Sequence, residues 1–175
     1  SSGVVVISEE QKVQYVGRIL PGKLRGVERL AAVREAMNDV FAAASEDILF
    51  AAVEGYAYDV GAGRVFELGE VGGVVKLALH DAEIPFVVVA PTQLKQFVTG
   101  SGSATKELMR QAVLKKWGID VTQDDECDAF GLAQVARAFH LDKGTTRAEL
   151  EVLKKLKDTD KKISLVAAPS RAISI

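Results

Sequence analysis

The sequence predicts one α/β domain, in which a mixed β-sheet is covered by helices on both of its faces. Near the start, residues 4–7 and 13–19 are apolar stretches on either side of a polar turn, which is the pattern of a β-hairpin. Further on, residues 48–54 and 85–90 are short and almost continuously apolar, as buried strands are. Segments with helical periodicity alternate with these strands. Ligands in such folds bind at the carboxyl ends of the strands.

The elements after the hairpin follow from the same patterns. Helices are expected where apolar residues recur three or four positions apart, and loops where glycine, serine and threonine gather. In chain order we expect a helix at 25–44, the strand at 48–54, a loop at 56–63, a helix at 64–80, the strand at 85–90, and helices at 92–98, 105–117, 125–140 and 147–157. Residues 1–141 are therefore expected to form the α/β domain. Residues 142–175, which are polar and rich in lysine before a short apolar run, are expected to form a C-terminal extension.

Composition excludes several classes of protein. The hydrophobic fraction of 48% and the charged fraction of 26% are those of a globular domain with a sizeable core. The single cysteine, Cys127, rules out an internal disulfide and is compatible with a reducing compartment. No apolar run is long enough to cross a bilayer, so no membrane partner is expected. The net charge of −2 offers nucleic acid no average attraction, so DNA binding would need a local basic face.

Three carboxylates are placed as if to hold metal. Glu54 ends a buried strand, and Asp125 and Asp128 lie three apart at the start of a helix, so they share one helix face. If that face meets the strand end, three like charges converge, and a divalent cation is the usual way to relieve their repulsion. The alternative is an ordinary strand end and an ordinary helix start with Thr122 or Asp124 as the N-cap, because the helix dipole favours acidic residues there.

A loop rich in glycine and serine separates the helices at 92–98 and 105–117. Its glycines allow a nucleotide backbone to approach closely, its hydroxyls can donate hydrogen bonds, and the next helix begins with free amides. The alternative is a plain flexible connection flanked by solvated lysines. The candidate DNA-contacting residues of this region are Lys95, Gly100, Ser101, Gly102, Ser103, Lys106 and Arg110.

Three segments, in their order and spacing, resemble the RuvC family of Holliday-junction resolvases, which have an RNase H-like nuclease fold. They are Val53-Glu54 at a strand end, residues 91–106, and residues 125–133, which are similar to the family's Asp-x-x-Asp-Ala motif. The middle segment is the most specific, because two lysines eleven residues apart around a Thr-Gly-x-Gly loop are not generic. The resemblance runs from Gly3 to about His140.

The resemblance implies a five-stranded mixed sheet and a nuclease that resolves four-way DNA junctions by paired, metal-dependent phosphodiester hydrolysis. It implies two Mg²⁺ ions per active site, with Mn²⁺ able to substitute, held by Glu54, Asp125 and Asp128. Hard cations prefer such carboxylate oxygens, and a pair of them can serve both the attacking and the leaving oxygen. Lys95 and Lys106 match the family's basic residues near the cleaved phosphate, and Lys106 is the expected catalytic lysine. A cytoplasmic protein of bacterial or phage-like origin is implied.

Two further expectations concern DNA and a partner subunit. Tyr56 and Tyr58 are candidates to stack on an unpaired base, but the family usually has an aromatic residue where this chain has Ala57, so either tyrosine can instead simply pack. The helix at 64–80 contains Gly69, Gly72 and Gly73, which lower its helix propensity. This cost is tolerable if another backbone packs closely against the helix. That backbone belongs either to a second copy of the chain, since the resemblance places the homodimer contact on this helix, or to the chain's own sheet.

The chain departs from the family at its start. The family begins with a strand that ends in aspartate, and this chain starts at Ser1-Ser2-Gly3, just past that point. We therefore expect a gap in the sheet with unpaired backbone groups, weak metal binding and poor catalysis. One hypothesis is that the natural chain has roughly a dozen further residues upstream, enough for a strand and a turn. An intact mass that matches this sequence alone would reject it. A second hypothesis is that residues 163–168 or 172–175 fill the gap.

Two other functions stay open at this point. The first is a nucleic-acid-binding module of the same fold without catalytic activity. The second is a flavodoxin-like small-molecule domain, which predicts a phosphate-binding loop directly after the first strand, and the sequence shows no such loop.

Overall fold

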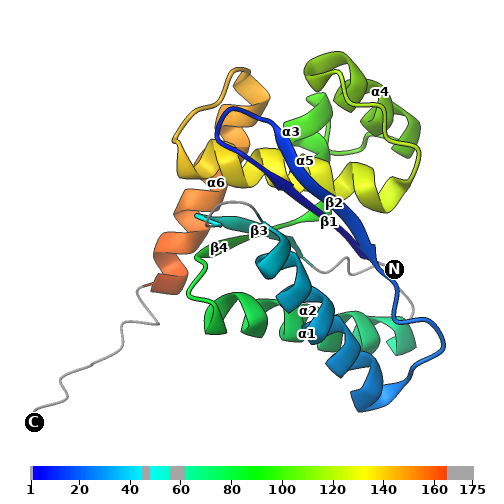
Figure 1. Ribbon diagram of the computed structural model, residues 1–175. Helices are drawn as coiled ribbons and strands as arrows, with labels where there is room; N and C mark the ends of the chain where they lie inside the picture. The colour runs from blue at the N-terminus through cyan, green and yellow to red at the C-terminus, as the bar shows by residue number, and fades with distance from the viewer. Residues whose placement is uncertain (1, 45–47, 56–61, 165–175) are drawn as a thin grey trace, which may run out of the picture.

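The computed structural model of the protein describes residues 2–44, 48–55 and 62–164 (Figure 1). Its elements in chain order are β1 (Ser2–Ile7), β2 (Val13–Ile19), α1 (Gly26–Ala43), β3 (Ala51–Glu54), α2 (Ala62–Asp81), β4 (Phe86–Val89), α3 (Pro91–Thr99), α4 (Lys106–Trp117), α5 (Asp124–His140) and α6 (Arg147–Ser164). Within this part of the chain, no helix has the length and apolar character needed to cross a membrane.

The strands form two pairs. β1 and β2 make the predicted antiparallel hairpin, in which Val4 lies opposite Gly17. Gln11 adopts a positive φ of 68° in the turn between them. β3 and β4 are parallel, with Ala51 opposite Phe86. The helix between β3 and β4 makes the crossover that a parallel pair requires.

Helices cover both faces of these strands, as predicted. In Figure 1, α1 and α2 lie on one side of the strands and α3 to α6 on the other. One core cluster joins β4 to α3, α4, α5 and α6, and its fully buried side chains include Leu94, Phe130 and Leu156. The other cluster lies between the strands and α1 and α2, where Val33 and Leu79 are buried. The strand layer is therefore enclosed between two helical layers.

The strand predicted at 48–54 is shorter in the structure. β3 begins at Ala51 rather than Ile48, because the neighbouring strand starts only after Pro85, whose carbonyl accepts the Ala51 amide at 2.9 Å. Upstream of that point there is no partner strand for the chain to pair with. Phe50 instead stacks on Phe139 of α5, with ring centroids 5.2 Å apart.

Helix boundaries also differ in three places. The N-cap of α5 is Gln123, not Thr122 or Asp124, and its side chain makes no capping hydrogen bond. Asp124 is thus the first helical residue. The helix predicted to end at residue 157 continues to Ser164, since the sequence has no helix-breaking residue before Pro169. α2 begins at Ala62, inside the segment expected to be a loop.

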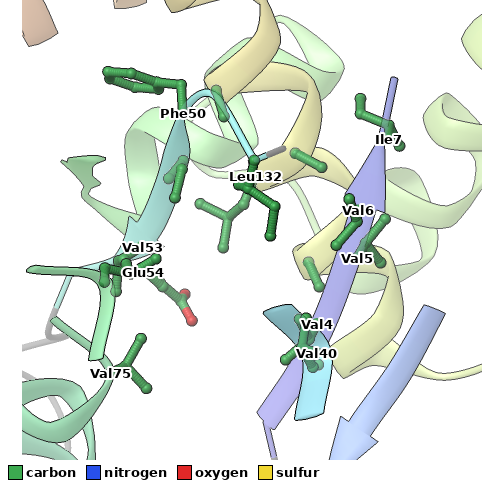
Figure 2. Close-up of a pocket in the computed structure, with 18 of the residues that line it drawn as sticks. Val4, Val5, Val6, Ile7, Val40, Phe50, Val53, Glu54, Val75 and Leu132 are labelled. Carbon is green, nitrogen blue, oxygen red and sulfur yellow. The ribbon is translucent and has the colours of Figure 1, made fainter. Parts of the chain in front are cut away.

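An open cavity of about 450 Å³ separates the two strand pairs. Its walls are the edges of β1, from Ser2 to Ile7, and of β3, up to Glu54 (Figure 2). Leu132 of α5 and Val40 and Val75 of the opposite helical layer complete the lining. Among the described residues, β1 pairs only with β2 and β3 pairs only with β4. The gap expected in the sheet is therefore confirmed, and it is walled mainly by apolar side chains.

On the β3 side of this cavity lie backbone groups that have no partner among the described residues. The amides of Ala51 and Gly55 donate to β4, at 2.9 Å and 2.8 Å. Because backbone groups alternate in direction along a strand, the amides and carbonyls of Ala52 and Glu54 point away from β4 toward the cavity. Such groups inside a protein need partners. The cavity therefore has both the apolar walls and the free hydrogen-bonding edges that an extended strand would use.

The C-terminal extension contributes a helix to the packed core. α6 packs against α3, and its residues Val152, Leu153 and Leu156 are buried in the same cluster as the β4 side chains. The carboxylate of Glu149 accepts a hydrogen bond from Lys116 of α4 at 3.0 Å. The helix is thus fixed by apolar burial and by a buried ion pair.

Candidate active site

The three predicted carboxylates border one end of the cavity. Glu54 ends β3, and its side chain reaches into the space between the strands (Figure 2). Asp125 and Asp128 come from the first turns of α5, which packs against both β1 and β3. All three carboxylates line the same cavity, as the arrangement expected from the sequence would require. The physical basis of this arrangement is the close packing of α5 across the ends of both strands.

A glycine that the sequence analysis did not single out allows this packing. A Cβ at Gly3 would lie 2.0 Å from the main-chain carbonyl oxygen of Asp125 and 3.0 Å from the Ala129 Cβ. Any larger residue would push β1 away from the first turn of α5. The strand predicted at 4–7 left Gly3 outside, and only the longer β1 of the structure shows a glycine inside a strand, where a close backbone approach is common.

The carboxylates raise one another's proton affinity. Burial is the largest cause that raises the pKa of Glu54, the charges of Asp128 and Asp125 raise this pKa further, and Lys95 lowers it. Burial also raises the pKa of Asp128, against the opposite effect of Lys106. Three carboxylates, two of which have raised pKa values, are a donor set suited to a hard divalent cation. Within the described ranges, however, no three side chains of metal-binding type stand close enough to enclose an ion as they are.

Both predicted lysines face this acidic cluster. Lys95 of α3 is half-buried, and its charge acts on Glu54 and Asp128. Lys106, the first residue of α4, is exposed, and its pKa is raised first by a hydrogen bond to Asp124 and then by the charges of Asp128 and Asp125. The two lysines, eleven positions apart in the sequence, thus both act on Asp128, Lys95 together with Glu54 and Lys106 together with Asp125.

The glycine and serine loop between α3 and α4 is built by internal contacts. Gly100 ends α3 with a φ of 89°, a conformation that favours glycine. The hydroxyls of Ser101 and Ser103 lie 3.2 Å apart. The Thr105 hydroxyl accepts from the Leu108 amide at 3.3 Å and so caps α4. The loop is therefore held by contacts of its own residues and by the cap of the helix that follows it.

Two residues near the cluster were missed from the sequence. Asp124 binds both Lys106 and Arg110, through different carboxylate oxygens. Arg18 of β2 lies 3.8 Å from the Asp125 carboxylate. The hairpin register places Arg18 opposite Gly3, so the strand pairing carries it to the helix start. Tyr56 and Tyr58 fall outside the described residues.

The chain is similar to known proteins of one family. The family model for crossover junction endodeoxyribonuclease RuvC matches residues 2–136. The chain belongs to the RuvC family. A RuvC protein of Gloeobacter violaceus is 32% identical over 65% of each chain, and one of Acidobacterium capsulatum is 39% identical over 57% of each. The chain spans less than two thirds of the length of these relatives.

Solved structures of the same family share the fold. The structure of RuvC from Thermus thermophilus superimposes with a TM-score of 0.61 at 21% identity, over 80% of this chain and 88% of that one. The RuvC of the same organism in complex with a Holliday junction substrate gives a TM-score of 0.59 at 19% identity, over 75% of this chain and 81% of that one. The predicted RNase H-like class of fold is confirmed.

Proposed function

We propose that the protein is a structure-selective endonuclease that resolves four-way DNA junctions by paired, metal-dependent hydrolysis of phosphodiesters. The observation that carries this proposal is that Glu54, Asp125 and Asp128 line one cavity, with Lys95 and Lys106 acting on carboxylates of this set. Membership of the RuvC family supports the reaction, and the junction complex of the Thermus thermophilus relative supports the substrate.

The metal would be held by Glu54, Asp125 and Asp128. Nucleases of this family are metal-dependent. We propose Mg²⁺ as the natural ion, two per active site, with Mn²⁺ as a substitute, because carboxylate oxygens suit hard cations. Such ions supply an activated water and stabilise the leaving oxygen. The raised pKa values of Glu54 and Asp128 fit this assignment, since burial first and the charges of neighbouring carboxylates second disfavour the ionised forms, and a bound cation would offset both effects.

The chain's own cations would hold the DNA. Lys95 and Lys106 would each place an ammonium group near the cleaved phosphate, and Lys106 would offset the charge that develops there. The exposed loop residues Gly100, Ser101 and Ser103 and the half-buried Gly102 would follow the sugar-phosphate backbone next to them. Arg110 would extend this basic surface along α4. We retain base stacking as the proposed role of Tyr56 and Tyr58.

We propose that two copies associate through α2. Phe66, Gly69, Gly73 and Leu77 follow one another at spacings of three or four, so they form one stripe on this helix. Phe66 is 75% exposed and Leu77 is 50% exposed. A Cβ added at Gly69 or Gly73 would meet nothing within 4 Å, which argues against close packing on the chain's own sheet. A two-fold dimer would match the symmetry of a four-way junction.

The second candidate is a junction-binding protein that does not cut. The observation that favours it is that no three potential ligands in the described segments already stand close enough to hold an ion. The open gap beside Glu54 also favours a protein that does not cut, because a sheet that is incomplete there constrains the positions of the carboxylates less. For a cutting enzyme we propose a cytoplasmic location, which the similarity to bacterial RuvC proteins supports.

A synthetic four-way junction distinguishes the two candidates. The nuclease proposal predicts paired, symmetric nicks that require Mg²⁺, and a loss of about 100-fold or more in rate in Glu54→Gln and Asp128→Asn, since each removes a metal ligand. Glu126→Gln is the matched control. It removes a carboxylate from the same turn of α5, but the Glu126 side chain does not line the cavity. Tight binding without cutting favours the second candidate. A protein that neither binds nor cuts the junction would contradict both candidates.

A further inference from the structure

The carboxylate of Asp124 holds two cations of α4 at once. Its Oδ2 atom lies 2.7 Å from Lys106 Nζ, and its Oδ1 atom lies 2.6 Å from Arg110 Nη1. Lys106 and Arg110 are four positions apart, so both project from one face of α4 toward the start of α5. Each oxygen of Asp124 thus serves a different cation, and the side chain links the two helices.

Lys106 depends on such a contact for its position. Its side chain is 73% exposed, and an exposed lysine on its four-carbon stem ordinarily moves among many rotamers. A charge-assisted hydrogen bond of 2.7 Å fixes the ammonium group at the entrance to the acidic cluster. The ammonium group has three N–H donors, so the bond to Asp124 leaves two for a phosphate.

We propose that Asp124 is a positioning residue that fixes Lys106 near Asp125 and Asp128, without itself contacting the scissile phosphate. This inference rests on the proposed nuclease function. Two opposite effects follow from the same geometry. The negative charge of Asp124 offsets the attraction of Lys106 and Arg110 for DNA, so it weakens binding. The fixed ammonium group speeds the cleavage step.

An ordinary structural role makes a different prediction. Asp124 stands in the first turn of α5, where the helix dipole favours an acidic side chain. If this were its only role, Asp124→Asn would lower thermal stability and leave the cleavage rate of the folded protein unchanged. A general electrostatic role would change DNA affinity alone.

Single-turnover cleavage at saturating junction DNA separates these roles. For Asp124→Asn we expect a rate lower by about 10-fold or more, with junction affinity equal to or tighter than that of the wild type. Asp124→Glu should restore part of the rate. Glu107→Gln is the control, because Glu107 pairs with Arg110 at 2.9 Å on the same helix turn but makes no contact with Lys106. Glu107→Gln should tighten junction binding as Asp124→Asn does, and its cleavage rate should stay within about twofold of the wild-type rate, as expected when only general electrostatics change.

A double-mutant cycle tests whether Asp124 acts through Lys106. In a Lys106→Met background, Asp124→Asn should have no further effect on the rate, because the group that it positions is already gone. A further loss of rate in that background would overturn the proposal. So would an unchanged rate in Asp124→Asn alone, or an equal loss in Glu107→Gln.

NMR of the lysine ammonium groups tests the same contact without cleavage. Asp124→Asn should lower the pKa of Lys106, because the bond to Asp124 is the largest cause that raises the Lys106 pKa. If the wild type cuts no junction but this shift is seen, the nuclease function fails and the fixed position of Lys106 stands. If the Lys106 signal does not respond, the proposal is wrong whether or not the protein cuts.

Discussion

Glu149 is the most fully satisfied buried charge among the described residues. Its Oε2 atom accepts from the Thr145 amide and hydroxyl, both at 2.7 Å, and its Oε1 atom accepts from Lys116 at 3.0 Å. Burial by itself would raise the pKa of this carboxyl, but the hydrogen bonds from Thr145 and Lys116 outweigh burial and lower it. The charged form is therefore the stable one in the fold.

Glu149→Ala should destabilise the protein by about 2–4 kcal/mol, because it leaves the Lys116 ammonium group and the Thr145 amide without their acceptor. Urea denaturation measures this loss. Since the folded pKa of Glu149 lies below its ordinary value, its contribution is present at neutral pH and is lost as pH falls through the folded pKa. The difference between variant and wild type should therefore shrink in acid.

The control for this experiment is Glu151→Ala on the same helix. Glu151 pairs with Arg147, whose side chain is 94% exposed, so its removal should cost less than about 0.5 kcal/mol. Equal losses in the two variants would mean that the buried network around Glu149 contributes nothing of its own.

At the scale of elements, the gap between β1 and β3 is the main structural feature. The two strands run in opposite directions, because the start of β1 and the end of β3 both lie at the Asp125 end of the cavity. One added strand would therefore be antiparallel to β1 and parallel to β3. The backbone groups that it would pair with are unpaired on the β3 side at Ala52 and Glu54.

Hydrogen exchange of the β3 amides measures whether this edge of the cavity is paired. The Ala52 amide, which points into the cavity, should exchange faster than the amides of Ala51 and Gly55, which donate to β4 at 2.9 Å and 2.8 Å. We expect a difference of at least about 10-fold under native conditions, because only the latter two require local opening. Equal protection of all three amides would show that the β3 edge of the cavity is already paired in solution.

At the scale of the whole molecule, the proposed dimer has its own test. Leu77→Glu places a charge on the exposed stripe of α2, so it should convert a dimer to a monomer, since a buried unpaired charge opposes association. Sedimentation velocity reports the change. Leu150→Glu is the control, because Leu150 is similarly exposed, at 54% against 50%, but lies on α6. A wild-type monomer, or a dimer that survives Leu77→Glu, would contradict the proposed interface.

Local pattern was sufficient for most of the fold. The hairpin, the parallel strand pair, α1 and the helices from α3 to α5 were all predicted to within a few residues, because apolar periodicity and glycine positions act over short distances. The errors at β3 and α6 have a common cause. A strand extends only as far as its partner strand allows, and a helix ends where tertiary contacts or a helix-breaking residue end it. The sequence of the segment alone therefore does not determine either boundary.

By itself the sequence determined the class of the fold, the family and the three carboxylates as candidates, since each depends on residue type and spacing. Only the tertiary structure decided that Gly3 lets β1 lie on the start of α5, that Asp124 and not solvent holds Lys106, and that α6 completes the core. These are contacts between segments far apart in the chain. Their existence depends on how packed surfaces fit together, and no single segment carries that information.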